Sequence, residues 1–129
     1  MVSRHFIVSL ILAIVLFPVF KWLSLLVFVF GLLIDVDHYF WYVIKFRDLS
    51  LMNAYYYALD KDRSDNDVLH IFHVVEVWIL VFILGFFNDV FFLLAVGLGV
   101  HLLMDFIHAI RYSMYNGRTY SLFTWMFRN

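Results

Sequence analysis

Long apolar runs separated by short polar breaks dominate the chain, and these runs predict membrane-spanning helices. A helix needs about 20 mostly apolar residues to cross the hydrocarbon core of a bilayer. Four runs approach or exceed this length, at about residues 5–20, 22–46, 68–87 and 90–112. The sequence "PVFK" separates the first two runs, because proline disfavours continued helix and lysine favours water, and "ND" separates the last two.

Two shorter segments are typical of helices that lie along a membrane surface. Residues 49–59, "LSLMNAYYYAL", carry tyrosines that suit the headgroup zone, and residues 119–128 form a second polar and aromatic segment. The pattern therefore predicts an all-α fold: a polytopic membrane protein with four transmembrane helices plus short interfacial helices. We expect residues 1–129 to form a single transmembrane helical domain.

Composition supports this class and limits the chemistry. Hydrophobic residues make up 65% of the 129 residues and charged residues only 15%, whereas soluble domains are about half apolar and a quarter charged. The formal net charge of −1 gives no support for nucleic-acid binding. The chain has no cysteine, so any metal ion would be held by His, Asp or Glu. The first apolar run lacks an A-x-A-like cleavage site, and we expect it to be retained as a span.

The basic residues predict an orientation in the membrane. If the four spans alternate, Lys21 is the only Lys or Arg on the far side, and the other eight of the nine fall on the near side. Basic residues concentrate on the cytoplasmic side of membrane proteins. We therefore expect a multi-pass protein of the cell (inner) membrane with both termini in the cytoplasm.

The same alternation brings the ionisable residues of all four spans to one depth, near the cytoplasmic face. In chain order these residues are His5, then Asp35, Asp37 and His38, then His70, His73 and Glu76, and finally His101, Asp105 and His108. Ionisable side chains within a span normally face the bundle interior or water, because lipid exposure costs at least ~2.5 kcal/mol each. The outer halves of the spans are almost purely apolar. The sequence therefore predicts a polar site near the cytoplasmic face.

Helical spacing gives each span one polar face. The three residues of the fourth span follow an i, i+4, i+7 pattern, which covers an arc of about 60°. The three of the third span step by three residues and cover about 120°. Asp35 and His38 are i, i+3 neighbours, and Asp37 points elsewhere unless the helix breaks there. Such faces are typical of a site inside a helical bundle.

These residue types suit a divalent metal ion, zinc above all, with manganese or iron as alternatives, and one or two ions in total. The candidate ligands are His5, Asp35, His38, His70, His73, His101, Asp105 and His108. Asp37 and Glu76 are candidate catalytic residues, as a general base or a bridging ligand. A metal-activated water would be the nucleophile of a hydrolytic reaction.

Four short motifs in this order resemble a known family, the LexA-binding, inner-membrane-associated hydrolases, also described as membrane-bound metal-dependent hydrolases. They are "HFIVS" from His5, "DVDH" at residues 35–38, "HIFH" at 70–73 and "GLGVHLLMD" at 97–105. The resemblance implies a metal-dependent hydrolase, and the family's distant similarity to zinc-dependent phospholipases C and nucleases suggests phosphoester chemistry. Members often carry Arg and Ser after the two histidines of the pair, where this chain has Ile71 and Val74. Glu76 and His108 lie outside the family pattern.

The leading hypothesis is a hydrolase that cleaves a lipid-like phosphoester at the cytoplasmic leaflet, with membrane lipid as its surroundings. A metal-ion or proton transporter would use the same ionisable residues, but the outer halves of the spans offer few polar groups for a path to the far side. A non-enzymatic membrane anchor for a regulatory partner is a further alternative. The polar residues could also serve only to hydrogen-bond helices together. A chain this short could form a homo-oligomer to seal its cavity.

Overall fold

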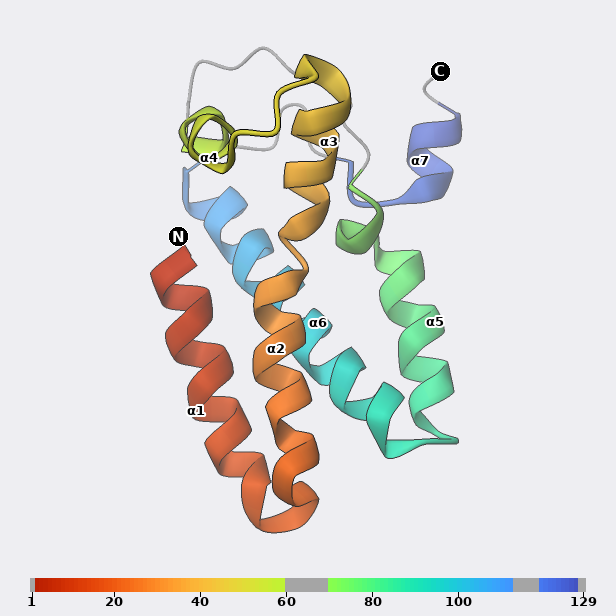
Figure 1. The fold of residues 1–129 in the computed structure, drawn as a ribbon. Coiled ribbons are helices and arrows are strands. Elements are labelled where there is room, and N and C mark those ends of the chain that lie inside the picture. Colours follow the sequence, from red (N-terminus) through yellow and green to blue (C-terminus); the bar gives the residue numbers. More distant parts are fainter. Residues whose placement is uncertain (1, 60–69, 113–118, 128–129) are drawn as a thin grey trace.

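A computed structural model describes residues 2–59, 70–112 and 119–127, and within these residues the protein is helical with no strand. The expected all-α class is confirmed. The elements are α1 (Val2–Phe20), η1 (Lys21–Ser24), α2 (Leu25–Leu33), α3 (Val36–Phe46), α4 (Leu51–Leu59), η2 (Ile71–His73), α5 (Val75–Gly85), α6 (Asp89–Tyr112) and α7 (Leu122–Met126). Figure 1 shows α1, α2, α5 and α6 running between two ends of the molecule, with the N-terminus, α4 and α7 together at one end.

The predicted turn between the first two runs is confirmed at Lys21. α1 continues through Pro18 to Phe20, and the chain then reverses through η1 into α2 (Figure 1). Lys21 adopts a left-handed backbone conformation with φ of 51°. The buried hydroxyl of Ser24 donates a 2.8 Å hydrogen bond to the Lys21 carbonyl and closes the turn.

The second apolar run is divided where "DVDH" occurs in the sequence. α2 ends at Leu33, α3 begins at Val36, and Ile34 and Asp35 form a turn between them. The Asp37 amide lies 3.5 Å from the Ile34 carbonyl, and the His38 amide lies 3.2 Å from the Asp35 carbonyl, so the chain makes tight turns here. This break changes the direction in which the aspartates project.

The third run differs from the predicted continuous helix over residues 68–87. Residues 60–69 lie outside the described part of the chain, and the helix α5 begins only at Val75, after the short η2 and an extended Val74. The physical reason is that backbone amides here find acceptors in other segments. The Phe72 amide donates to the Asp37 carboxylate, and the Val75 amide donates to the Tyr120 carbonyl at 2.9 Å.

Small residues bring the helices close together. A Cβ atom on Gly97 of α6 would lie 2.9 Å from the Val27 carbonyl oxygen of α2, and one on Gly85 would lie 2.8 Å from the Cα of Phe92. Between α5 and α6, the Trp78 indole donates a 3.0 Å hydrogen bond to the Ala95 carbonyl. Close approach through small residues is the usual means of packing membrane helices.

The short helices agree with the predicted interfacial segments in place but not in length. α4 spans Leu51–Leu59, against the predicted 49–59, and α7 spans Leu122–Met126, against 119–128, of which residue 128 lies outside the described chain. Before α4, the Asp48 carboxylate accepts hydrogen bonds from the Asn53 side chain, the Ser50 amide and the Tyr42 hydroxyl. These bonds, that of Asn53 foremost, lower the pKa of Asp48 below its ordinary value.

Two helical stretches are long and apolar enough to cross a membrane, Arg4–Phe46 and Asp89–Arg111, and Val75–Gly85 is a shorter apolar helix. Four such stretches were expected, so the number differs. The first stretch contains both arms of the hairpin formed by α1 and α2, whereas α5 is shorter than the expected third span because its first residues are not helical. The hairpin turn at Lys21 and the turn between α5 and α6 lie at the same end of the molecule (Figure 1).

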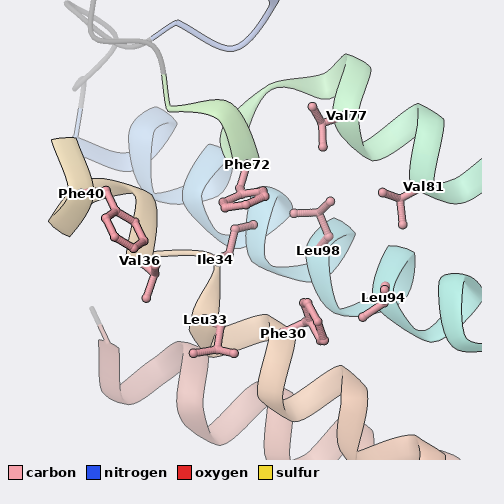
Figure 2. A pocket seen from close by; sticks show the side chains of 10 residues that line it. All are labelled: Phe30, Leu33, Ile34, Val36, Phe40, Phe72, Val77, Val81, Leu94 and Leu98. Carbon is pink, nitrogen blue, oxygen red and sulfur yellow. The ribbon is translucent and has the colours of Figure 1, made fainter.

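An apolar cavity of about 370 Å³ lies among α2, α3, η2, α5 and α6. Figure 2 shows the ten side chains that surround it, all of which are hydrocarbon or aromatic. Three of these lining residues, Ile34, Val36 and Phe72, are immediate chain neighbours of the ionisable residues Asp35 and His73.

Candidate metal centre

Five ionisable side chains from four parts of the chain converge on one point. We call them the inner cluster: His5 of α1, Asp35 of the α2–α3 turn, His73 of η2, and His101 and Asp105 of α6. Every member except Asp35 is buried. All five were predicted as metal ligands, and the predicted convergence of their side chains is confirmed, whereas their role as ligands stays a prediction.

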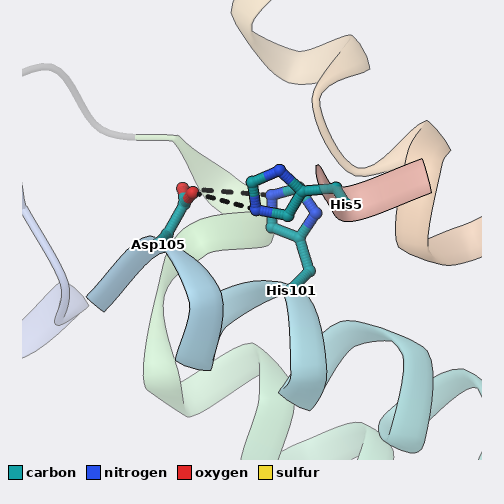
Figure 3. Close-up of side chains that lie close together, drawn as sticks. All are labelled: His5, His101 and Asp105. Atoms are coloured by element: carbon teal, nitrogen blue, oxygen red, sulfur yellow. Dashed lines mark ion pairs between the residues drawn. The ribbon is translucent and has the colours of Figure 1, made fainter. Parts of the chain in front are cut away.

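The two carboxylates lie between the three imidazoles. Asp105 Oδ1 lies 3.3 Å from His5 Nε2, and its Oδ2 lies 3.7 Å from His73 Nε2 and 3.9 Å from His101 Nε2. Asp35 Oδ1 lies 3.4 Å from His101 Nε2 and 3.6 Å from His73 Nε2. Figure 3 shows His5 stacked on His101, with ring centroids 4.4 Å apart, and both rings beside the Asp105 carboxylate.

The other nitrogen of two of these imidazoles is already held. His101 Nδ1 donates a 2.9 Å hydrogen bond to the Gly31 carbonyl, which can only accept. His73 Nδ1 pairs with Asp37 Oδ2 at 3.1 Å. A neutral imidazole that donates through Nδ1 presents a lone pair at Nε2. In their neutral form, both rings therefore present lone pairs toward carboxylate oxygens.

This arrangement fits a cation. The Nε2 atoms of His73 and His101 are buried and make no hydrogen bond, and carboxylate oxygens lie 3.4–3.9 Å from them. Two acceptors that face each other in a buried site are unfavourable unless a proton or a metal ion lies between them. The carboxylate oxygens and imidazole nitrogens of the cluster lie 3.3–3.9 Å apart. In a tetrahedral zinc site with bonds of about 2.0–2.1 Å, neighbouring ligand atoms lie ~3.3 Å apart, so the shortest of these distances matches such a site. Held outer nitrogens are also the usual support of metal-binding histidines.

Asp37, His38 and His70 form a second group, which we call the outer cluster. Asp37 Oδ1 lies 2.8 Å from His38 Nδ1 and 3.8 Å from His70 Nδ1, and Asp37 Oδ2 accepts from the Phe72 amide. The His38 and His70 rings are stacked with centroids 3.8 Å apart. All three residues are partly exposed. Through His73, the Asp37 carboxylate joins the outer cluster to the inner one.

The break in the helix explains why two aspartates two residues apart serve the same region. On a continuous helix Asp35 and Asp37 would project in different directions. With the turn between α2 and α3, Asp35 Oδ1 lies 3.6 Å from His73 Nε2 and Asp37 Oδ2 lies 3.1 Å from His73 Nδ1. The two carboxylates therefore lie beside opposite nitrogens of one imidazole, and only Asp37 is hydrogen-bonded to it.

The structure does not bring Glu76 and His108 to either cluster. Glu76 accepts hydrogen bonds from the Ser121 hydroxyl at 2.5 Å and from the Leu122 amide at 3.1 Å, so it holds the start of α7. The expected shared face of His70, His73 and Glu76 is wrong, because Val74 is extended and separates the histidines from α5. His108 lies on α6 beyond Asp105 and belongs to none of the candidate ligand groups.

The sequence did not reveal the Gly31 carbonyl as part of the centre. A backbone oxygen carries no signal of its own in a sequence, and the only indication is a glycine in the apolar run before Asp35. The structure shows why glycine is required there: a Cβ atom on Gly31 would collide with the Ser9 side chain of α1. Gly31 therefore allows α1 to approach α2 closely, and its carbonyl oxygen also holds the His101 ring.

Comparisons with protein-family models, with curated proteins and with solved structures find no match for this chain. Functional inference therefore depends on the residues of the two clusters and on their geometry.

Proposed function

We propose that the protein is a membrane-embedded, metal-dependent hydrolase that cleaves a lipid-like phosphoester at the cytoplasmic leaflet. The inner cluster would hold a divalent ion, with zinc favoured and manganese or iron as alternatives for an all-nitrogen and oxygen ligand set. The motif order from His5 to Asp105 supports the same function through its resemblance to membrane-bound metal-dependent hydrolases.

One observation carries the proposal. The Nε2 atoms of His73 and His101 are buried without a hydrogen bond and face the carboxylates of Asp35 and Asp105. A cluster built only to pack helices would pair each of these nitrogens with a donor or an acceptor. A metal ion satisfies both the nitrogens and the oxygens at once.

The residues of the chain then have distinct tasks. Asp35 is the accessible member of the inner cluster, with 43% of its side chain exposed against 9% for Asp105, so water and substrate reach the centre at Asp35. Asp37 orients His73 and fixes the proton on Nδ1. A bound divalent ion would supply activation of water and stabilisation of charge on the phosphoryl oxygens.

Asp37 suits orientation better than proton transfer. One of its oxygens lies 2.8 Å from His38 Nδ1, and the other accepts from the Phe72 amide and pairs with His73. A general base must reach the proton that it removes, and its lone pairs must be available. The proton of the attacking water would therefore pass to Asp35, which is exposed.

The arrangement of helices supports a four-span topology for this enzyme. The turn between α1 and α2 and the turn between α5 and α6 lie at one end of the molecule, whereas the N-terminus, α4 and α7 lie at the other end (Figure 1). We propose that α1, α2–α3, η2–α5 and α6 each cross the membrane, with both termini in the cytoplasm. The clusters then lie close to the cytoplasmic face.

The proposal is tested with the full chain in lipid nanodiscs. Elemental analysis should find zinc, manganese or iron bound, and chelation should abolish hydrolysis of bis(p-nitrophenyl) phosphate, with activity restored by the ion. Asp105→Asn should remove both the metal and the activity, whereas the matched carboxylate variant Glu76→Gln should retain both. Metal-free protein, or activity unchanged by chelation, would contradict the proposal. Metal flux into proteoliposomes that Asp105→Asn abolishes would favour a transporter instead.

A further inference from the structure

Residues that line the apolar cavity are sequence neighbours of residues in the inner cluster. Ile34 and Val36, which flank Asp35 in sequence, both line it, and so does Phe72, which precedes His73. The same short backbone segments therefore carry members of the inner cluster and apolar side chains that line the cavity, and Figure 2 shows the latter.

The exposure of the lining residues gives the cavity a floor and an open rim. Ile34 and Leu98 are 5% and 8% exposed, so they form the buried floor. Phe30, Leu33 and Phe40 are 41%, 50% and 59% exposed, so they lie at the rim. A rim of exposed aromatic and aliphatic groups on helices that enter a bilayer opens toward hydrocarbon rather than toward water.

The chemistry of the walls selects the occupant. The lining consists entirely of apolar side chains from α2, α3, η2, α5 and α6, and its volume of about 370 Å³ lies within the usual range for small-ligand sites. Ligand sites for polar molecules carry a few convergent polar groups, and here those groups lie outside the cavity, in the adjoining cluster at Asp35 and His73. A molecule with a hydrocarbon tail and a polar head matches both parts.

We infer that this cavity binds one hydrocarbon chain of the substrate, entering sideways from the bilayer, and that it places the phosphoester head at Asp35. The inference rests on the proposed function and adds the site that binds the hydrocarbon chain and the residues that select it. Val77 and Val81 of α5 form one wall, and Leu94 of α6 lies across from them, next to Leu98 of the floor (Figure 2). The size of these side chains then limits chain length.

The test compares two chromogenic phosphodiesters that share a p-nitrophenyl group and differ in the second ester, methyl or dodecyl. Wild-type protein in nanodiscs should hydrolyse the dodecyl ester with kcat/KM at least about 10-fold above that of the methyl ester, because a few methylenes in an apolar pocket supply that discrimination. Val81→Phe, which fills the cavity, should remove the preference and leave the methyl ester and the metal content unchanged.

Ile79→Phe is the matched control. Ile79 lies on the same helix, is 45% exposed and does not line the cavity, so its replacement should leave both esters unaffected. Val77→Phe provides a second filling variant if Val81→Phe does not fold, as judged by its metal content. The control also corrects for partition of the dodecyl ester into the nanodisc, which is equal for all variants.

The outcomes separate the two proposals. Metal-dependent hydrolysis in which Val81→Phe and Val77→Phe leave the chain preference intact would overturn the cavity assignment and retain the hydrolase. Loss of preference in Ile79→Phe as well would indicate a general effect of phenylalanine on α5 rather than filling of the cavity, and would also overturn it. Failure to hydrolyse either ester with any metal ion would overturn the proposed function itself.

Discussion

The inner and outer clusters are built from the same two residue types, yet their hydrogen bonding differs. In the outer cluster, Asp37 lies 2.8 Å from a ring nitrogen of His38, and its other oxygen accepts a backbone amide. In the inner cluster, the Nε2 atoms of His73 and His101 are buried, make no hydrogen bond and face carboxylates. Within the outer cluster, the Asp37 carboxylate is therefore satisfied by protein groups alone.

This difference indicates that the inner cluster is the candidate metal site and that the outer cluster is its candidate support. A hydrogen-bonded carboxylate and histidine set can serve as outer support for a metal site, because it fixes ring orientation and the position of the proton. A set of buried acceptors that face one another instead requires a cation. Composition and spacing alone do not separate the two, since both contain His and Asp at helical intervals.

The largest effect is expected from removing the carboxylate shared by the inner imidazoles. Asp105→Asn should lower affinity for the divalent ion by more than ~100-fold, because loss of a direct ligand exceeds the 10–100-fold typical of outer support. Competition with a chromophoric chelator measures this, and circular dichroism checks the fold. An affinity within about 10-fold of wild type would place the metal elsewhere.

A smaller effect is expected at the residue that joins the clusters. Asp37→Asn keeps an oxygen for the Phe72 amide but weakens the hold on His73 Nδ1, so metal affinity should fall by about 10–100-fold. The same chelator competition applies. If Asp37→Asn matched Asp105→Asn in its effect, the carboxylate would be a ligand rather than a support.

A still smaller effect on affinity is expected within the outer cluster. His70→Ala removes a stacked ring 3.8 Å from that of His38 and should change metal affinity by less than ~10-fold, with the number of bound ions unchanged. Elemental analysis of the two proteins in parallel decides the point. A fall from two ions to one would make the outer cluster a second metal site.

Glu76 offers a carboxylate outside both clusters. Glu76→Gln should leave metal content unchanged and weaken the attachment of α7, lowering stability by up to ~2 kcal/mol, as expected for the loss of a helix cap. Hydrogen exchange at residues 122–124 would report the loosened helix. Loss of metal on this change would return Glu76 to the centre.

The smallest effect is expected at the turn before α4. Because hydrogen bonds lower the pKa of Asp48, its contribution to stability is present above the ordinary value of 3.8 and is lost as pH falls through the lowered pKa. Asp48→Asn should remove this pH dependence without changing metal affinity at neutral pH. Exchange protection of the Ser50 and Asn53 amides, followed against pH, measures it.

The helical class, the turn at Lys21, the helix α6 and the five residues of the inner cluster could be predicted from the sequence. Apolar runs and ionisable positions inside them are strong signals, because bilayers tolerate few charges. The pairing of His101 with Asp105 followed directly from their i, i+4 spacing on a true helix.

The rest depended on tertiary acceptors that a sequence does not display. The helix expected over residues 68–87 begins at Val75 because the Phe72 and Val75 amides bond to Asp37 and Tyr120. For the same reason Glu76, which a regular helix would place beside His73, instead holds α7. Hydrogen bonds to other segments therefore override the local helix propensity in the segment that carries His73.

The most direct test is X-ray absorption spectroscopy of the zinc-loaded protein in nanodiscs. We predict nitrogen and oxygen neighbours at about 2.0–2.2 Å and the multiple-scattering signature of three imidazoles, from His5, His73 and His101. His101→Ala should reduce that signature to two, whereas His70→Ala should leave three. A spectrum without imidazole scattering, or one that His70→Ala alters and His101→Ala does not, would contradict a metal centre at the inner cluster.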